Sequence, residues 1–296
     1  MNNFSNKTSN VIKGGFIYLI MIVAFLVISL IGQSLLLAVG LQEGALFYAL
    51  NSLFSILAII LAVFFTAKTD GVKALTICNV KKFDWVYILF AILLSAGMFL
   101  GLGFLNYTIS KVFVLLGLKI PANNLAMNST ADFIIFSICL CLLPAIFEEC
   151  FFRGVLLNGV KGKGYAVVLT VSFCFAIYHG SFVQFFYQFI YGAGLTLLAI
   201  KSKSIFPSVV SHFINNFLVV LFAFIGFEVN FLNPLVISVG LLLLVAFTIL
   251  VIFYRNKQND LVVIQNNGSS VKEFFIPFGI LGTGLMTLLA ILSLIP

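Results

Sequence analysis

Five polar side chains stand out because they lie inside long apolar stretches of a chain that has only two histidines. Glu148 and Glu149 are adjacent in one stretch, His179 lies in a second, and His212 and Asn216 lie in a third. An ionisable group inside a bilayer costs roughly 2.5–3.5 kcal/mol on insertion scales, so such groups are retained mainly where they pair or perform chemistry. Carboxylate and imidazole groups together can activate water. The residues therefore indicate an active site inside the membrane.

The two adjacent glutamates are expected to have different roles, because consecutive helical residues point about 100° apart. Glu149 and Arg153 are four residues apart with the acid first, which is the favourable order for an ion pair. That pair would leave Glu148 free for chemistry, since Glu148 has no second partner on its own helix. The simpler alternative is that Glu149 and Arg153 only anchor the helix near the cytoplasm. Pro144 lacks a backbone N–H and should loosen the helix one turn before Glu148.

The histidines also have a simpler interpretation, because an intramembrane histidine often only forms a hydrogen bond to a neighbouring helix. His212 and Asn216 are one helical turn apart and therefore project from one face. At about 1.5 Å per residue, Glu148, His179 and His212 lie roughly 16, 22 and 13 Å from the cytoplasmic ends of their helices. Helix tilt allows side chains at these depths to meet.

The composition places the helices that carry these residues in lipid. Hydrophobic residues make up 62% of the 296 residues, charged residues make up 8%, and the mean hydropathy is +1.21. A soluble domain has about 25% charged residues. Apolar runs of the length that crosses a bilayer, about 20 residues, are Gly15–Leu41, Ala45–Ala67, Trp85–Leu105, Phe133–Leu157, Tyr165–Gly180, Phe182–Ile200, Ile205–Phe227, Leu232–Tyr254 and Phe274–Ile295.

The fifth run is short and the ninth is the weakest, so we expect eight to nine spans. The predicted fold is an all-α, polytopic membrane bundle that forms a single domain over residues 1–296. No interval between the runs is long enough for a soluble domain.

Basic residues are distributed unevenly between the two sets of connections, which predicts a multi-pass protein of the cell membrane with a cytoplasmic N-terminus. The net charge is +7. With nine spans, only Lys111 and Lys119 fall on the outer side. The inner basic residues are Lys7, Lys13, Lys68, Lys73, Lys81, Lys82, Lys161, Lys163, Lys201, Lys203, Arg255, Lys257 and Lys272. The positive charge therefore sets the orientation, and nothing supports a nucleic-acid partner.

Three motifs occur in a fixed order within about a third of the chain. They are E-E-x-x-x-R (Glu148, Glu149, Arg153), F-x-x-x-H (Phe175, His179) and H-x-x-x-N (His212, Asn216). This set resembles the CPBP intramembrane protease family, which includes CAAX prenyl endopeptidases and bacteriocin-processing, Abi-type proteins. The resemblance covers roughly residues 133–227 and implies a catalytic core made of spans four to seven.

The resemblance implies an intramembrane endopeptidase that cleaves a peptide bond near the cytoplasmic side with activated water. Glu148 is then the general base, and His179 orients or activates the water. His212 and Asn216 would stabilise the oxyanion. Glu149, Arg153 and Phe175 would support these residues.

Whether a metal takes part is open at this point. Glu148, His179 and His212 could hold Zn²⁺ with a free fourth position, as catalytic zinc sites do. The chain has no H-E-x-x-H motif, and a glutamate and histidine mechanism without metal is the alternative. We favour the absence of a tightly bound metal and keep zinc as the second hypothesis.

The expected partners are membrane lipid and a peptide or membrane-protein substrate. A composition rich in Phe, Ile and Asn is typical of a low-GC bacterium, so peptide processing, bacteriocin maturation and self-immunity are better hypotheses than prenyl-protein cleavage. A non-catalytic scaffold or immunity protein that has kept the motifs is the main alternative. A transporter would also place ionisable groups near the midplane, but we find no symmetric pair of interrupted helices.

Overall fold

The computed structural model describes residues 13–120, 127–161, 164–254 and 269–295. These residues form a helical protein, and the expected all-α membrane fold is confirmed. The α-helices are α1 (Lys13–Ala38), α2 (Ala45–Asp70), α3 (Ala74–Ile77), α4 (Val86–Leu115), α5 (Thr130–Phe136), α6 (Leu143–Glu149), α7 (Leu157–Gly159), α8 (Gly164–Tyr178), α9 (Phe182–Ser202), α10 (Phe206–Ile225), α11 (Pro234–Phe253), α12 (Val271–Phe274) and α13 (Ile280–Leu292).

Short irregular pieces complete the described chain. Three π-helical turns are η1 (Ser137–Leu142), η2 (Cys150–Leu156) and η3 (Phe275–Gly279). Two strands of two residues each, β1 (Val160–Lys161) and β2 (Ser269–Ser270), pair in parallel. The piece from Thr130 to Gly159 runs through α5, η1, α6, η2 and α7 as one continuous span.

Eight helices in the described residues are long and apolar enough to cross a membrane. The fifth run of the sequence is the exception, because α8 has 15 residues. At about 1.5 Å per residue it spans roughly 22 Å, short of a hydrocarbon core of about 30 Å. The helix stops at Tyr178, and Gly180 turns the chain with a φ of 58°. His179 therefore lies at a helix end within the depth of the bundle.

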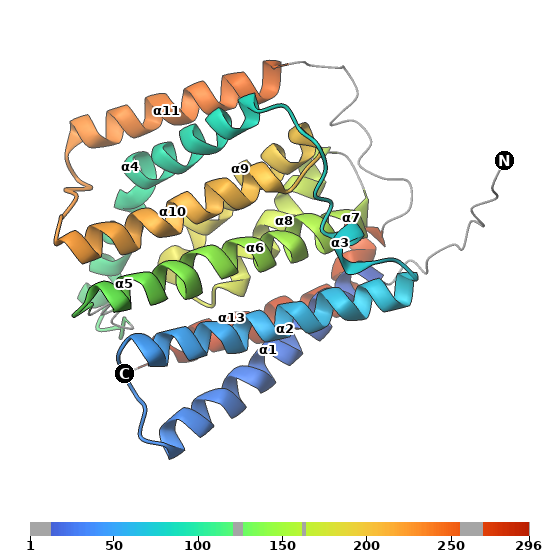
Figure 1. The fold of residues 1–296 in the computed structure, drawn as a ribbon, viewed down its shortest axis with the longest axis horizontal. Coiled ribbons are helices and arrows are strands. Elements are labelled where there is room, and N and C mark those ends of the chain that lie inside the picture. Colours follow the sequence, from blue (N-terminus) through green and yellow to red (C-terminus); the bar gives the residue numbers. More distant parts are fainter. Residues whose placement is uncertain (1–12, 121–126, 162–163, 255–268, 296) are drawn as a thin grey trace.

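The helices lie roughly side by side and alternate in direction, so that the connections collect at two ends of the molecule (Figure 1). We call one of them the basic end. It contains the link between α2 and α4, the β1–β2 pair and the link between α9 and α10. Two hydrogen bonds join these links, from Ile205 N to Asn79 O and from Lys81 N to Ser204 Oγ. The lysines of this end whose side chains the structure describes are Lys68, Lys73, Lys81, Lys82, Lys201, Lys203 and Lys272.

The other end, which we call the distal end, contains the last turns of α4 and α10 and the start of α5 (Figure 1). Phe133 of α5 stacks on Phe224 of α10 with ring centroids 4.5 Å apart. Lys119 N donates a hydrogen bond to Leu294 O, which ties the segment after α4 to the end of α13. The charged side chains described at this end are Glu43, Lys111, Lys119, Asp132 and Glu228.

Glycines allow the closest helix contacts, as is usual when helices associate in lipid. α4 and α11 cross where Gly101 meets Gly240, and a Cβ on Gly240 would overlap the Gly101 backbone. At the basic end a Cβ on Gly154 would lie 2.8 Å from Ile77 O. The glycine that follows Arg153 thus lets α3 pack directly against the motif-bearing span.

Candidate active site

The structure brings four polar residues of the three motifs to one cavity of about 1360 Å³. Glu148, His179, His212 and Asn216 all line it. They come from α6, the end of α8, and α10, so three separate helices supply the set. This is the convergence that the helix depths allow.

The two adjacent glutamates face different surroundings. Glu148 lines the cavity, whereas the side chain of Glu149 is fully buried and does not line the cavity. Glu148 Oε2 is buried and has no hydrogen-bond partner among the residues that the structure describes. A buried carboxylate oxygen normally has a partner, and a water or substrate in the cavity can supply it.

Glu149 anchors a buried polar network. Its Oε1 accepts hydrogen bonds from Arg153 Nη1 at 2.8 Å and from His212 Nδ1 at 2.9 Å. The first is the intrahelical ion pair predicted from the spacing, and both side chains in it are fully buried. Arg153 Nη2 donates to Gly192 O at 3.0 Å, and its guanidinium lies 4.4 Å from the Phe175 ring centroid. Arg153 therefore ties the fourth span to α9 and α8.

The contact with Glu149 fixes the orientation of His212. A carboxylate can only accept, so Nδ1 of His212 must donate to it. The opposite nitrogen, Nε2, lies 3.9 Å from Glu148 Oε2. This separation is too long for a direct hydrogen bond, and it allows one water to contact both groups. The sequence assigned Glu149 only a supporting role in its own helix and missed its bond to His212.

His179 is oriented in a similar way by its own helix. Its Nδ1 lies 2.8 Å from Phe175 O, and a backbone carbonyl only accepts, so Nδ1 carries the proton. Nε2 of the neutral ring is then an acceptor. The Phe175 ring packs against both histidines, with centroid distances of 4.8 Å to His179 and 5.8 Å to His212. Phe175 thus separates Arg153 from the two imidazoles and holds their rings in place.

The side chain of Asn216 forms a hydrogen bond to the span that contains Glu148. Its Nδ2 donates to Leu140 O at 3.3 Å. In a regular α-helix this carbonyl would pair with the N–H of residue 144, which is a proline here. The chain responds with the π-helical turn η1, a type of irregularity that is frequent at functional sites. A carboxamide has two N–H donors, so Asn216 keeps a second donor beside the cavity.

Several cavity residues on α9 and α10 were missed from the sequence. Tyr187 donates a hydrogen bond to Asn215 Oδ1 at 2.6 Å, and both residues line the cavity. Gln184 and Gln188 of α9 line it as well. Three polar residues at positions i, i+3 and i+4 of an apolar span form a polar face, and this signal could have identified them.

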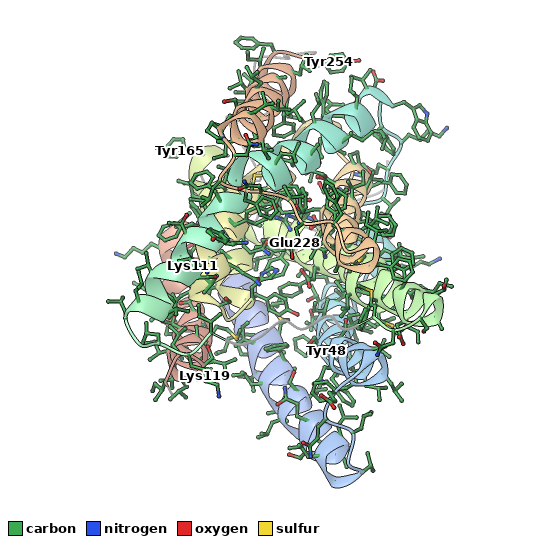
Figure 2. The ribbon with its side chains drawn as sticks, turned by 90° about the vertical axis from the view of Figure 1, so that its left-hand side faces the viewer. Tyr48, Lys111, Lys119, Tyr165, Glu228 and Tyr254 are labelled. Atoms are coloured by element: carbon green, nitrogen blue, oxygen red, sulfur yellow. The ribbon has the colours of Figure 1, made fainter. Side chains whose placement is uncertain are left out.

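The cavity does not extend toward the basic end. From Glu148 its lining continues along the second half of α4 to Lys111 and along α10 to Ala223, and it includes Phe231, which follows α10. These are residues of the distal end, which faces the viewer in Figure 2, where Lys111 is labelled. At about 1.5 Å per residue, His212 lies roughly 9 Å from the start of α10, at the basic end. Cleavage near the cytoplasmic side stays a prediction.

The residues present do not fit a zinc centre in this arrangement. Among the described residues, no group of three or more His, Cys, Asp or Glu side chains is close enough to hold a metal ion. His212 Nδ1 and His179 Nδ1 are engaged with Glu149 and Phe175 O, so each ring would have only Nε2 to offer a metal ion. We therefore derive no step through a metal at Glu148, His179 and His212.

The comparisons with known proteins concern the part of the chain that builds this site. Residues 130–218 match the family model described as type II CAAX prenyl endopeptidase Rce1-like. The matched segment contains all three motifs and lies almost wholly within the expected core of residues 133–227. No curated protein and no solved structure matches the chain. The resemblance of this part of the chain to the CPBP family, and to its CAAX-type membrane endopeptidases, is thus confirmed over residues 130–218.

Proposed function

We propose that the chain is an intramembrane endopeptidase that hydrolyses a peptide bond with water activated by Glu148 and His179. The observation that carries this proposal is that Glu148 Oε2 has no hydrogen-bond partner among the described residues and lies in a cavity that it shares with both histidines. The family match supports a membrane endopeptidase of the CAAX type. The eight membrane-length helices make it a multi-pass membrane protein.

In the proposed reaction a water lies between Glu148 and the histidines. Glu148 Oε2 accepts a proton from this water as its oxygen attacks the scissile carbonyl carbon. His179 Nε2 accepts the second hydrogen bond of the water and orients it. The proton held by Glu148 then passes to the leaving amine, which completes hydrolysis without a covalent intermediate on the chain.

The carbonyl oxygen becomes negatively charged during the attack and needs donors in a site with little water. Asn216 offers its free N–H. His212 offers Nε2–H when the ring carries both protons, and the carboxylates of Glu148 and Glu149 on either side balance that charge. The bonds of Glu149 to Arg153 and His212 would hold this arrangement in place.

We further propose that residues 133–227 are the catalytic core of one membrane domain over residues 1–296. The substrates are peptides or membrane proteins. Peptide processing, bacteriocin maturation and self-immunity fit a cavity larger than the roughly 300–1,000 Å³ of typical small-molecule sites.

The test compares the peptides in membrane and secreted fractions of cells that contain either the wild-type protein or Glu148→Gln. Peptides that appear only with the wild type identify a protease and its substrate class together. Matched protein levels in the membrane are the control for expression.

Identical peptide profiles combined with a phenotype on deletion would instead support the second candidate, a non-catalytic scaffold or immunity protein. The observation that favours this candidate is the extent of buried polar bonding around Arg153, which would be retained for stability alone.

A further inference from the structure

We propose that the cavity takes an extended polypeptide segment from the extracytoplasmic side of the membrane. This inference rests on the proposed function and adds to it the side of entry and the form of the substrate. It combines the direction of the cavity, the distribution of charge between the two ends and the chemistry of the cavity wall.

The side of entry follows from charge. All described lysines except Lys111 and Lys119 lie at the basic end, while the distal end has acidic and basic side chains in similar number. Lys7, Lys163, Arg255 and Lys257 lie outside the described residues, and their places in the sequence assign them to the same connections as the basic end. Cytoplasmic loops are the ones enriched in Lys and Arg. The basic end is therefore cytoplasmic, and the distal end, toward which the cavity extends, faces outward.

The depth of the catalytic groups in the bundle shows why the direction of the cavity matters for substrate entry. His212 lies roughly 9 Å from the basic end of α10 and roughly 20 Å from its distal end. The shorter path is closed by a packed layer in which Ser95 Oγ donates to Ser211 O at 2.8 Å and Tyr191 OH lies 3.1 Å from Ser211 Oγ. Ser95, Ser211 and Tyr191 are all buried. The substrate therefore takes the longer path, from the distal end.

One side of that path carries polar side chains from α4 and α9. Asn106 and Ser110 are one turn apart on α4, and Gln184 and Gln188 are one turn apart on α9; all four line the cavity. Polar side chains at membrane depth are costly unless they serve a purpose. An extended peptide needs partners for its N–H and C=O groups where water is scarce, and carboxamides supply both donors and acceptors.

One acceptor on this side is unused. Asn106 Oδ1 is buried and has no hydrogen-bond partner within the described part of the chain. The α10 side beyond Asn216 is apolar and includes Val219, Val220 and Ala223. A peptide with its backbone toward α4 and α9 and its apolar side chains toward α10 satisfies both sides. A purely hydrocarbon ligand would leave the Asn106 oxygen unpaired.

The side of entry is tested by cysteine labelling with a membrane-impermeant maleimide in intact cells. Single cysteines are placed in the full-length chain, with the native cysteines replaced, at three positions. Ser110→Cys reports the cavity, Lys119→Cys reports the exposed distal end and Lys73→Cys reports the exposed basic end. We expect the first two to react in intact cells, and Lys73→Cys to react only after the membrane is permeabilised.

Two results would overturn the proposal. One is that Ser110→Cys reacts only after permeabilisation, together with Lys73→Cys. The other is that it reacts under neither condition while both exposed controls behave as expected. These readouts do not depend on catalysis. A protein that labels as expected but cleaves nothing contradicts the proposed function alone, and a cleaving protein with reversed labelling contradicts the side of entry alone.

The form of the substrate is tested on a cleaved peptide with two matched variants of α4. Asn106→Leu removes the unpaired acceptor, and Thr108→Leu removes a polar group from an exposed position that does not line the cavity. We expect Asn106→Leu to lower kcat/KM about 3- to 10-fold, the effect of one hydrogen bond, and Thr108→Leu to leave it unchanged. Equal values for both variants would show that the peptide backbone does not use this side of the cavity.

Discussion

The core contains two neighbouring groups of polar side chains, each with a glutamate and a part of His212. We call the group that is sealed from the cavity the closed grouping and the group that lines the cavity the open grouping. In the closed grouping Glu149, Arg153 and the Nδ1 side of His212 are bonded to one another and sealed from the cavity. In the open grouping Glu148, His179 and the Nε2 side of His212 face the cavity, and Glu148 Oε2 lacks a hydrogen-bond partner in the described protein. The two groupings meet at a single ring, that of His212.

The difference teaches how a membrane protein can keep a carboxylate facing a cavity in a site with little water. A buried charge is tolerated when it is paired and hydrogen-bonded. In the closed grouping the charges of Glu149 and Arg153 are paired and hold the histidine, although Glu149 Oε2 and Arg153 Nε have no hydrogen-bond partner among the described residues. In the open grouping Glu148 has no such ion pair with an arginine or lysine of the described chain. Substitutions in the two groupings should therefore affect different properties.

The largest effect is expected from Glu148→Gln in the open grouping. The amide keeps the shape but cannot accept the proton of water, so we expect kcat to fall about 10²- to 10⁴-fold. The thermal midpoint of the purified protein should change little. The measurement is single-turnover cleavage of a peptide identified in cells, alongside thermal unfolding in detergent. Cleavage at the wild-type rate would remove Glu148 from the role of base.

Asn216→Ala tests a residue that contacts both the cavity and the helix of Glu148. Loss of an oxyanion donor should lower kcat about 10²- to 10³-fold. The loss of the bond to Leu140 O should also destabilise the protein. Pro144→Ala restores a backbone N–H for that carbonyl, so the double variant should regain stability without regaining activity. A change in KM alone would contradict the oxyanion role.

Glu149→Gln should break the closed grouping and affect stability first. It leaves the buried Arg153 charge without its carboxylate, a change that costs about 3–5 kcal/mol when one partner of a buried pair is removed. Unfolding in detergent measures the loss, and Arg153→Met in the same background should recover part of it. A variant as stable as the wild type but inactive would instead place Glu149 in the chemistry itself.

The smallest effect is expected from Tyr187→Phe, at the edge of the open grouping. The change removes the hydrogen bond to Asn215 Oδ1 and keeps the ring. We expect a loss of about 1 kcal/mol in the free energy of unfolding and a change in kcat below threefold. A loss of activity as large as that of Asn216→Ala would add Tyr187 to the groups that contact the reacting peptide.

The sequence by itself determined the class of fold and the identity of the polar set. Long apolar runs in a medium without water must satisfy their own backbone groups, and this forces helices of membrane length. The spacing of Glu149 and Arg153 determined their ion pair, because neighbours four residues apart share a helix face. The motif order determined the family resemblance.

Only the tertiary structure decided what these residues do to one another. The bond between Glu149 and His212 joins residues 63 positions apart, and no local pattern contains it. The same holds for Asn216, whose acceptor is a carbonyl of another span that Pro144 leaves unpaired. The direction of the cavity depends on how α4, α9 and α10 pack, and helix length alone does not report packing. The helical periodicity of the sequence determines on which face of its helix a residue lies. Only the packing of the helices determines which residues of other helices that face contacts.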